Sequence, residues 1–339
     1  MAASESKTPK IIFGTGTWGS SDSPLVDVTT PDQAKKFLDI LRNNGVTNLD
    51  TSRAYPLGAP GTSEALLGQI KAPDSFTIDS KVISNDPGHH KSARVAESVD
   101  ASLQALGVKK VDIMFLHWPD RTVPFTEPLV ALNEAYKQGK FERFGLSNYS
   151  ASEVEEIIQI CEKEGYVKPT VYQGQYNALC RRGEKQLFPT LRAKNMAFHA
   201  YSPAAGGALN AGSSRAANKT LLGELTRAWY GGNKKALAAE AAQKHNMTGH
   251  ELALRWVLYH SAIDYSLGDA VIVGASRSAQ LEETLQMIKK GPLPEDLVKA
   301  VDDIWEAVEP EATSYSPWVD TEGKAFSLPI SEISEKDVK

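Results

Sequence analysis

The sequence predicts an α/β fold in which about eight β/α units close into a (β/α)8, or TIM, barrel, with an N-terminal β-hairpin and an extra C-terminal helix and tail. Short apolar segments alternate with amphipathic helices, which is typical of parallel sheets with right-handed crossovers. No shift in composition marks a domain boundary among the 339 residues, and barrels often use this length as one domain. We therefore expect a single domain over residues 1–339, with a core at about 11–308.

The first helix is expected to begin at Pro31. Thr30 is a capping residue, and proline is favoured at the first helical position. Apolar residues then recur at the helical period as far as Leu41. Gly45 follows as a glycine stop, which ends the helix.

The predicted strands are brief and rich in Val, Ile, Phe and Leu, as expected where both faces are buried. They are Asn48–Thr51, Phe76–Lys81, Val111–His117, Phe144–Ser147, Thr170–Gln175, Ala197–Tyr201 and Ala270–Gly274. Before them, Ile11–Phe13 begins a short β-type segment that glycines interrupt. We expect that segment to form the N-terminal hairpin.

Amphipathic helices are predicted between the strands. They are Ser63–Gln69, Ala93–Leu106, Pro128–Lys137, Ala151–Glu164, Lys185–Lys194, Lys234–Tyr259 with a break near Asn246, and Ala279–Ile288. A further helix, Pro294–Val308, follows the barrel, and Glu309–Lys339 is a polar tail. The small-residue segment Ala204–Lys219 is expected to be a long loop, and loops of this length are usually functional or disordered.

Composition and charge disfavour several classes of partner. The formal net charge is −5 and there is no long basic run, which argues against a nucleic-acid partner. Residues 1–10 lack the apolar core of a signal peptide, and no apolar run is long enough to cross a membrane. Cys161 and Cys180 stand alone, as inert thiols of a reducing compartment do. We therefore expect a cytoplasmic protein without a membrane partner, and we leave open whether it forms a homo-oligomer.

Two short motifs match the signatures of nucleotide-dependent enzymes, but the residues around them do not form the structure that each signature needs. Gly14–Gly19 spells G-x-G-x-x-G, yet a turn near Pro24 follows instead of a helix whose N-terminus would meet a pyrophosphate. A tight hairpin is the preferred interpretation. Tyr136 and Lys140 have the Y-x-x-x-K spacing, but Gly139 indicates a helix end between them, so their side chains do not share one helix face.

Polar residues gather at the C-terminal ends of the predicted strands, where barrel enzymes place their catalytic groups. They are Asp50, Tyr55, Lys81, His117, Ser147, Asn148, Gln173 and Tyr201. A resemblance to the aldo-keto reductase superfamily is carried, in the family's order, by Leu49–Tyr55, Ser80–Val82, Phe115–Pro119 and Gly145–Tyr149. Similarity to the aflatoxin-aldehyde reductase branch is carried by Val171–Gly174, Tyr176–Ala178, Leu187–Pro189, Ala204–Gly207, Gly274–Ser276 and Gln280–Glu282.

The resemblance implies a catalytic tetrad of Asp50, Tyr55, Lys81 and His117, and physical chemistry supports these roles independently. Carbonyl reduction needs a proton at the oxygen as hydride reaches the carbon. A free tyrosine has a pKa of about 10, and Lys81 is the proposed cation that lowers it. Asp50 would hold Lys81 charged although buried, and His117 would orient and polarise the carbonyl. Taken singly, Asp50 could cap a loop, Lys81 could lie on the surface, and His117 could be a core imidazole.

The cofactor expected from this resemblance is NADP(H). Ser147, Asn148 and Gln173 offer donors and acceptors to the nicotinamide carboxamide. Tyr201 can stack on the nicotinamide ring. The structural alternative for these residues is a set of polar loop caps.

The cofactor phosphates are expected near the last two loops of the barrel and the start of its last helix. The candidate contacts there are Ser202, Pro203, Gly206, Gly207, Leu209, Ser276, Arg277 and Gln280. Arg277 is the candidate for the 2′-phosphate, because a guanidinium fork matches phosphate. Thr284 stands where the branch shows asparagine as an adenine contact, and Glu282 and Glu283 are alternatives.

An apolar mouth lined by Trp18, Tyr55, Trp118 and Tyr149, with His117 at the carbonyl, is consistent with aromatic or alkyl aldehydes. Trp18 has the equal alternative of packing the hairpin against the barrel. Arg181 matches a loop arginine of the branch and could attract an anionic substrate end. The histidines lack metal-ligand spacing, so no metal is expected.

These observations predict NADPH-dependent reduction of aldehydes, and by extension ketones, to alcohols, with Tyr55 as the general acid. A cofactor-binding regulatory subunit of the potassium-channel β-subunit type is the alternative, because such subunits resemble the same fold and retain the tetrad. A barrel glycosidase is less favoured, since it needs two carboxylates and only Asp50 is prominent at a strand end. The natural aldehyde, the direction of flux and the strictness of NADPH over NADH are not decided by the sequence.

Overall fold

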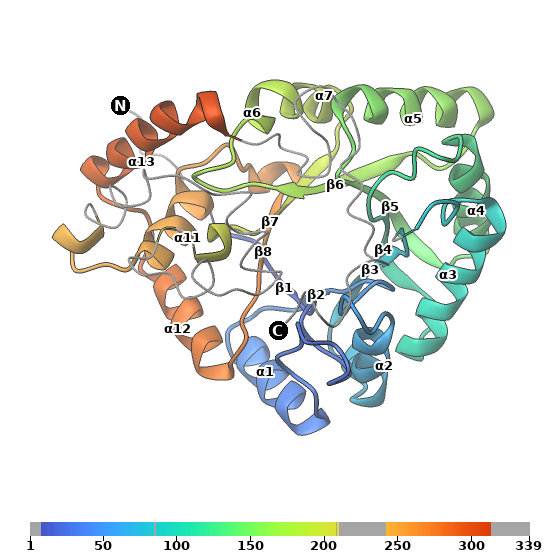
Figure 1. Ribbon diagram of the computed structural model, residues 1–339, viewed down its shortest axis with the longest axis horizontal. Coiled ribbons are helices and arrows are strands. Elements are labelled where there is room, and N and C mark those ends of the chain that lie inside the picture. The colour runs from blue at the N-terminus through green and yellow to red at the C-terminus, as the bar shows by residue number, and fades with distance from the viewer. Residues whose placement is uncertain (1–7, 85, 208, 210–241, 313–339) are drawn as a thin grey trace.

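The short apolar segments form eight parallel strands that close into a barrel in sequence order (Figure 1). The structure is a computed structural model that describes residues 8–84, 86–207, 209 and 242–312. The strands are β1 (Ile11–Gly14), β2 (Asn48–Asp50), β3 (Thr77–Val82), β4 (Val111–Leu116), β5 (Phe141–Ser147), β6 (Pro169–Gln175), β7 (Ala197–Tyr201) and β8 (Ala270–Val273). The predicted (β/α)8 TIM barrel is therefore confirmed.

Helices surround the barrel (Figure 1). They are α1 (Pro31–Asn43), α2 (Thr62–Gln69), α3 (Ser92–Leu106), α4 (Thr126–Lys137), α5 (Ala151–Glu164), α6 (Gly183–Gln186), α7 (Phe188–Ala193), α11 (Gly249–Tyr259), α12 (Ser278–Lys289) and α13 (Glu295–Val308). α1 begins as predicted, because Thr30 and Gln33 cap each other's backbone N–H groups and Pro31 opens the first turn. The extra C-terminal helix is α13.

Side chains fill the barrel, so its interior is a packed core. Ile113, Phe115, Val171 and Ala197 form one buried cluster. Gly145 on β5 lies against Phe115, and a Cβ atom there would be 2.3 Å from the phenyl ring. A larger residue at Gly145 would therefore displace the Phe115 ring from the barrel interior.

The N-terminal segment differs from the prediction. Ile11–Gly14 is not a hairpin arm but a barrel strand, β1, which runs parallel to both β2 and β8. Beyond it, Trp18 and Val28 form only an isolated bridge. The apolar run is so short that its length and periodicity cannot distinguish a barrel strand from a hairpin arm. The helix that follows β1 begins only at Pro31, as the rejection of the dinucleotide motif requires.

Two of the predicted helices are interrupted in the structure. Lys185–Lys194 is divided into α6 and α7, which meet at Leu187, and a proline occupies the first turn of α7. The predicted break near Asn246 is confirmed, because Asn246 has a φ of 52° and α11 begins only after Thr248. Residues 210–241 lie outside the described part, and they include most of the predicted loop Ala204–Lys219 and the start of Lys234–Tyr259. The tail from residue 313 lies outside it as well.

Within the described ranges, no helix is long and apolar enough to cross a membrane. In the same part of the chain, no cluster of three or more His, Cys, Asp or Glu side chains is arranged to hold a metal ion. Cys161 and Cys180 are both buried. Burial raises the pKa of each thiol to about 12, so neither is a nucleophile at neutral pH.

Candidate active site

A cavity of about 1060 Å³ opens at the C-terminal ends of the strands, at the upper end of the range for small-molecule sites. It brings together most of the residues that the sequence singled out. They are Asp50, Tyr55, His117, Trp118, Ser147, Asn148, Gln173, Tyr201, Ser202, Pro203, Gly206, Gly207, Ser276, Arg277, Gln280, Glu283 and Thr284. Lys81 lies beneath them, in contact with Asp50.

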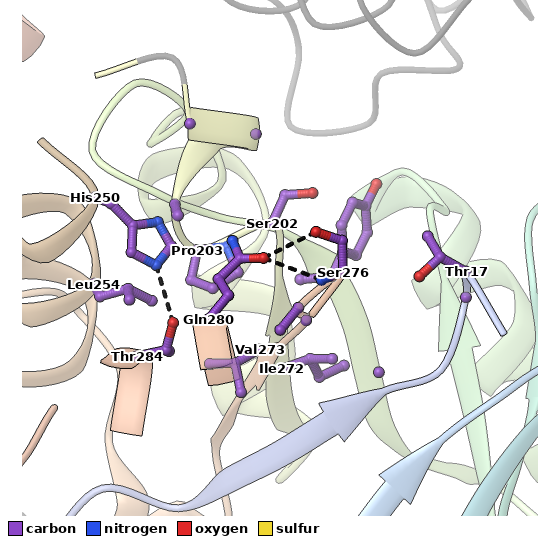
Figure 2. A pocket seen from close by; sticks show the side chains of 18 of the residues that line it. Thr17, Ser202, Pro203, His250, Leu254, Ile272, Val273, Ser276, Gln280 and Thr284 are labelled. Atoms are coloured by element: carbon purple, nitrogen blue, oxygen red, sulfur yellow. Dashed lines mark hydrogen bonds between the residues drawn. The ribbon is translucent and has the colours of Figure 1, made fainter. Parts of the chain in front are cut away.

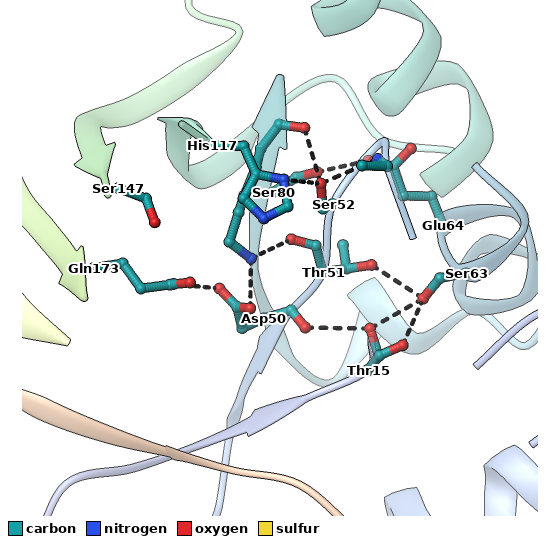
Figure 3. A network of polar contacts seen from close by, with 12 residues as sticks. Thr15, Asp50, Thr51, Ser52, Ser63, Glu64, Ser80, His117, Ser147 and Gln173 are labelled. Atoms are coloured by element: carbon teal, nitrogen blue, oxygen red, sulfur yellow. Dashed lines mark hydrogen bonds and ion pairs between the residues drawn. The ribbon is translucent and has the colours of Figure 1, made fainter. Parts of the chain in front are cut away.

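Lys81 and Asp50 form a buried ion pair at the floor of the cavity (Figure 3). Lys81 Nζ lies 2.5 Å from Asp50 Oδ1 and donates to the carbonyl oxygen of Thr51 at 2.8 Å. The other oxygen of Asp50 accepts from the side-chain amide of Gln173 at 2.7 Å. Lys81 is fully buried, and a buried lysine is stable in its charged form only when it is paired in this way.

The register of β2 and β3 explains how the pair forms. Asp50 is opposite Asp79 in the sheet, and Lys81 lies two residues further along β3, so its side chain points to the same face as that of Asp79. Lys81 therefore enters the barrel interior one layer above Asp79. Neither carboxylate oxygen of Asp79 has a hydrogen-bond partner among the described residues. Burial raises the pKa of Asp79 well above its usual range, and the charge of Asp50 adds to that rise.

Electrostatics keep Lys81 protonated. Burial alone would lower the pKa of its ammonium group, but the negative charge of Asp50 favours the cation, and the pKa is raised overall. Lys81 Nζ lies 4.9 Å from the centre of the Tyr55 ring. Burial raises the pKa of Tyr55, and Lys81 offsets only part of that rise. The expectation that Lys81 brings the pKa of Tyr55 below its ordinary value is therefore wrong for this structure, because desolvation is the larger effect.

His117 lies between Tyr55 and Trp118. The centre of its ring is 5.4 Å from that of Tyr55, edge to face, and 4.0 Å from that of Trp118. Its Nδ1 atom is 3.1 Å from Ser52 Oγ. Burial lowers the pKa of His117 well below 6.5, and the positive charge of Lys81 lowers it further. His117 is therefore a neutral imidazole with one N–H group to donate.

Ser147, Asn148 and Tyr201 form a second polar group on the cavity wall. The Asn148 amide donates to the carbonyl oxygen of His117 at 3.0 Å and to Ser147 Oγ at 2.9 Å. The Tyr201 hydroxyl donates to Asn148 Oδ1 at 2.8 Å. These bonds join the ends of β4, β5 and β7, so the wall is held in one arrangement.

The other end of the cavity lies beside the N-termini of α11 and α12 (Figure 2). Ser276 donates through its N–H and its hydroxyl to Gln280 Oε1, at 3.1 and 3.0 Å. Arg277 is the N-cap residue of α12 and makes no side-chain capping bond to that helix. Gly249 and His250, in the first turn of α11, line the same space. Two helix N-termini and an arginine make this end favourable for an anionic group.

His250 belongs to the site although the sequence reasoning did not single it out. Its Nε2 atom is 3.2 Å from Thr284 Oγ1 (Figure 2). The sequence does indicate where His250 lies, because Thr248 and Glu251 have the T-x-x-E spacing of a helix start. In the structure, Thr248 caps the backbone N–H of Glu251. That start places His250 in the first turn, facing α12. Asp27 was also missed, and it lines the cavity in the loop that follows β1.

Two aromatic residues predicted at the mouth do not line the cavity. Trp18 is fully buried, with its ring centre 5.7 Å from that of Phe13 on β1 and 5.4 Å from that of Phe37 on α1. Its alternative, a packing role, is therefore the correct one. Tyr149 is also fully buried. It follows Asn148, whose φ of 65° turns the chain so that the next side chain enters the core instead of the cavity.

Arg181 and Leu209 also lie away from the cavity lining. The Arg181 guanidinium lies 4.6 Å from the centre of the Trp256 ring and donates to Asp302 at 2.7 Å and Glu184 at 3.0 Å. It thus joins α6, α11 and α13, and its charge is already matched by acidic side chains. Leu209 is buried in the core cluster, as an apolar side chain favours. The predicted substrate contact of Arg181 is therefore corrected, and the predicted cofactor contact of Leu209 stays a prediction.

The fold and the cavity can be compared with known proteins. Residues 10–306 match the model of the aldo/keto reductase family. The chain is 38% identical over 322 residues to oxidoreductase sirO of Leptosphaeria maculans, which covers 91% of this chain and 97% of that protein. It is 35% identical over 333 residues to aflatoxin B1 aldehyde reductase member 2 of Rattus norvegicus, with 91% and 87% covered.

A human relative gives the same result. The chain is 35% identical over 297 residues to aldo-keto reductase family 7 member A3 of Homo sapiens, with 80% of this chain and 88% of that protein covered. The similarity to the aflatoxin-aldehyde reductases, carried by the motifs at the strand ends, is confirmed by these matches. The chain therefore belongs to the aldo/keto reductase family of oxidoreductases.

Proposed function

We propose that this oxidoreductase reduces aldehydes, and by the same chemistry ketones, to alcohols with NADPH, and that Asp50, Tyr55, Lys81 and His117 carry the reaction. One observation supports the proposal most directly. The Lys81–Asp50 ion pair lies under Tyr55, and Tyr55 stands edge to face with a neutral His117 in the same cavity. Relatives named aldehyde reductases favour an aldehyde as the substrate.

Each residue of this group has a distinct task in the proposed reaction. The bound nicotinamide supplies the hydride. The Tyr55 phenol is protonated at neutral pH, so its hydroxyl can donate to the carbonyl oxygen. Lys81 then stabilises the phenolate that remains, and Asp50 holds the ammonium group in place. His117 orients the carbonyl, and Trp118 provides an apolar surface for the rest of the substrate.

The wall of the cavity fits the nicotinamide end of such a cofactor. Ser147, Asn148 and Gln173 would hold the carboxamide, and Tyr201 would stack on the ring. Their donors and acceptors are fixed by mutual hydrogen bonds and by the bond from Gln173 to Asp50. The wall thus needs little rearrangement to bind a planar amide.

The other end of the cavity fits the phosphates. Gly206 and Gly207 have φ values of 60° and 80°, a conformation in which small residues let backbone N–H groups approach a phosphate closely. Arg277, at the start of α12, would bind the 2′-phosphate that distinguishes NADP from NAD. The remaining contacts proposed at this end are Ser202, Pro203, Ser276, Gln280, Glu283 and Thr284.

The extent of the functional unit is part of the proposal. We infer that the barrel and α13 form one domain within residues 1–339, because the family match reaches residue 306 and α13 ends at Val308. A cytoplasmic location stays a prediction of the sequence alone.

The experiment mixes purified protein with NADPH and 4-nitrobenzaldehyde and follows the loss of NADPH absorbance. Tyr55→Phe should lower turnover by about 10²–10⁴-fold, the usual contribution of a general acid. The affinity of this variant for NADPH, measured by quenching of tryptophan fluorescence, should be unchanged. Turnover that survives in Tyr55→Phe would show that another group supplies the proton.

The choice of cofactor is tested separately. Arg277→Gln should weaken NADPH binding by about tenfold or more, because a charged hydrogen bond to phosphate is lost, and should leave NADH binding nearly unchanged. Tight NADPH binding without turnover on a panel of aldehydes would favour the regulatory-subunit function instead. An absence of NADPH binding would overturn the cofactor proposal.

A further inference from the structure

A serine lies against the imidazole of His117. Ser52 Oγ is 3.1 Å from His117 Nδ1 (Figure 3). Both side chains are buried, Ser52 completely and His117 to within 5%. Ser52 follows β2 and His117 follows β4, so the contact joins two loops that meet only in the closed barrel.

The hydrogen bonds around Ser52 decide where its single proton goes. Ser52 Oγ accepts the backbone N–H of Ala54 at 3.1 Å and has one hydrogen of its own to donate. Two acceptors are within reach, His117 Nδ1 at 3.1 Å and the carbonyl oxygen of Lys81 at 3.5 Å. The second is at the limit of a hydrogen bond, and that oxygen also accepts the backbone N–H of Arg53 at 3.0 Å. Donation to Nδ1 is therefore favoured.

We propose that Ser52 is a positioning residue that holds His117 in the tautomer with its hydrogen on Nε2. In a neutral imidazole only one nitrogen carries a hydrogen, so a proton donated to Nδ1 fixes that hydrogen on Nε2. Nε2 is then a hydrogen-bond donor for the substrate carbonyl oxygen. In the opposite tautomer Nε2 presents a lone pair to that oxygen and repels it. This role rests on the proposed function, since it concerns how His117 meets the carbonyl.

Contacts other than Ser52 hold both the backbone and the ring of His117. The Asn148 amide donates to the His117 carbonyl oxygen, and the Trp118 and Tyr55 rings pack on the imidazole. Removal of the Ser52 hydroxyl should therefore release the tautomer without moving the ring. A purely structural role for Ser52 would show the reverse pattern, with lower stability and an unchanged tautomer.

The test is nitrogen NMR on the intact protein with ¹⁵N-labelled histidine, which has only seven ring systems to resolve. The His117 signals are assigned by their loss in His117→Asn. In the wild type, Nε2 should carry the hydrogen and Nδ1 should show the shift of an unprotonated nitrogen. In Ser52→Ala both tautomers should be populated, because one hydrogen bond shifts such an equilibrium by about tenfold. Ser52→Thr keeps a hydroxyl and should restore the wild-type pattern.

Ser63→Ala is the matched control. Ser63 is a buried serine whose hydroxyl contacts Thr15 and Thr51 in the same loop cluster (Figure 3) but not His117, so the His117 tautomer should not change. For aldehyde reduction, Ser52→Ala should lower kcat by up to about tenfold and leave the affinity for NADPH unchanged.

A hydrogen on Nδ1 of His117 in the wild type would overturn the proposal, and so would an unchanged tautomer in Ser52→Ala. The wild-type measurement decides even if Ser52→Ala does not fold. The NMR readout needs no turnover, so failure of the proposed reductase function would be recognised separately, by the wild-type assay. A released tautomer with an unchanged kcat in an active enzyme would also overturn the assigned role.

Discussion

The side-chain amide of Gln173 donates to Oδ2 of Asp50 at 2.7 Å, while Oδ1 of the same carboxylate pairs with Lys81. The two residues come from β6 and β2, on different sides of the barrel, and they are 123 positions apart in the sequence. The sequence predicts Gln173 only as a cofactor contact, yet it also fixes the carboxylate that holds Lys81. The wall proposed to bind the cofactor is therefore hydrogen-bonded to the proposed catalytic pair of Asp50 and Lys81.

Gln173→Glu tests this link, because it places a second carboxylate against Asp50. The like charge raises the pKa of the new carboxyl group above its unfolded value of about 4.3. The destabilisation caused by the new carboxylate is therefore absent at acid pH, and it grows as the pH rises above about 4.3. We expect the variant to lose about 1–3 kcal/mol of unfolding free energy at pH 7 and much less at pH 4, measured by urea denaturation. A deficit that does not depend on pH would contradict this explanation.

Asp50→Asn should be among the most damaging substitutions in the barrel, because it leaves the buried Lys81 without its counter-ion. Loss of one partner of a buried ion pair costs about 3–5 kcal/mol, and urea denaturation would measure it. Adding Lys81→Met should recover much of that loss, since the unpaired charge is then removed. Asp303→Asn, which breaks an exposed pair with Lys299, is the control and should cost less than about 0.5 kcal/mol.

His199 should make the fold sensitive to acid. Burial lowers its pKa to about 3, and the charges of Lys10, Arg143 and Lys81 contribute, although the Gly268 backbone opposes them. The unfolded histidine takes up a proton near pH 6.5 and the folded one does not, so stability is present above that pH and is lost as the pH falls. The loss from this group should be about 2 kcal/mol between pH 6.5 and pH 5.

His199→Gln removes that proton uptake and provides the measurement. Relative to the wild type, the variant should gain about 2 kcal/mol in unfolding free energy when the pH is lowered from 7 to 5, as determined by urea denaturation at both values. If the difference between the two proteins stays constant over that interval, the imidazole is not held neutral by the fold.

Arg181→Met should affect stability and not substrate recognition. Its guanidinium stacks on Trp256 and donates to Asp302 and Glu184, so the variant should lose about 2–4 kcal/mol of unfolding free energy. The KM for aldehydes, with or without a carboxylate, should not change. Arg182→Met is the neighbouring control, since Arg182 donates to the backbone oxygen of Glu309 at 2.7 Å and should matter less. A selective rise in KM for anionic aldehydes would restore Arg181 to the substrate site.

The residues at the strand ends were the predictable part of the site, for a geometric reason. In a closed parallel barrel all strands end at the same rim, so Asp50, His117, Ser147 and Gln173 could be grouped from sequence position alone. The short strands next to glycines were harder to predict. The residues of β1 are predicted as a hairpin arm because so short a segment shows no clear hydrophobic period. Tertiary pairing with both β2 and β8 determines its place in the barrel.

The direction of a side chain just beyond a strand could not be predicted. Trp118 and Tyr149 each lie two positions past the end of a strand, and only Trp118 reaches the cavity. The difference arises from Asn148, whose left-handed backbone no sequence pattern specified. The contact between Ser52 and His117 was missed for a related reason, because it joins two loops that are 65 residues apart.

The closure of the barrel has a consequence for the newly made chain. Gly14 on β1 and Ile272 on β8 both line the cavity, and the two strands pair directly although they lie at opposite ends of the barrel sequence. Pairing between such distant segments carries a large entropy of loop closure and comes late. A chain still emerging from the ribosome therefore holds all four residues of the proposed tetrad before it has a pocket. Cofactor binding would then distinguish finished barrels from unfinished ones.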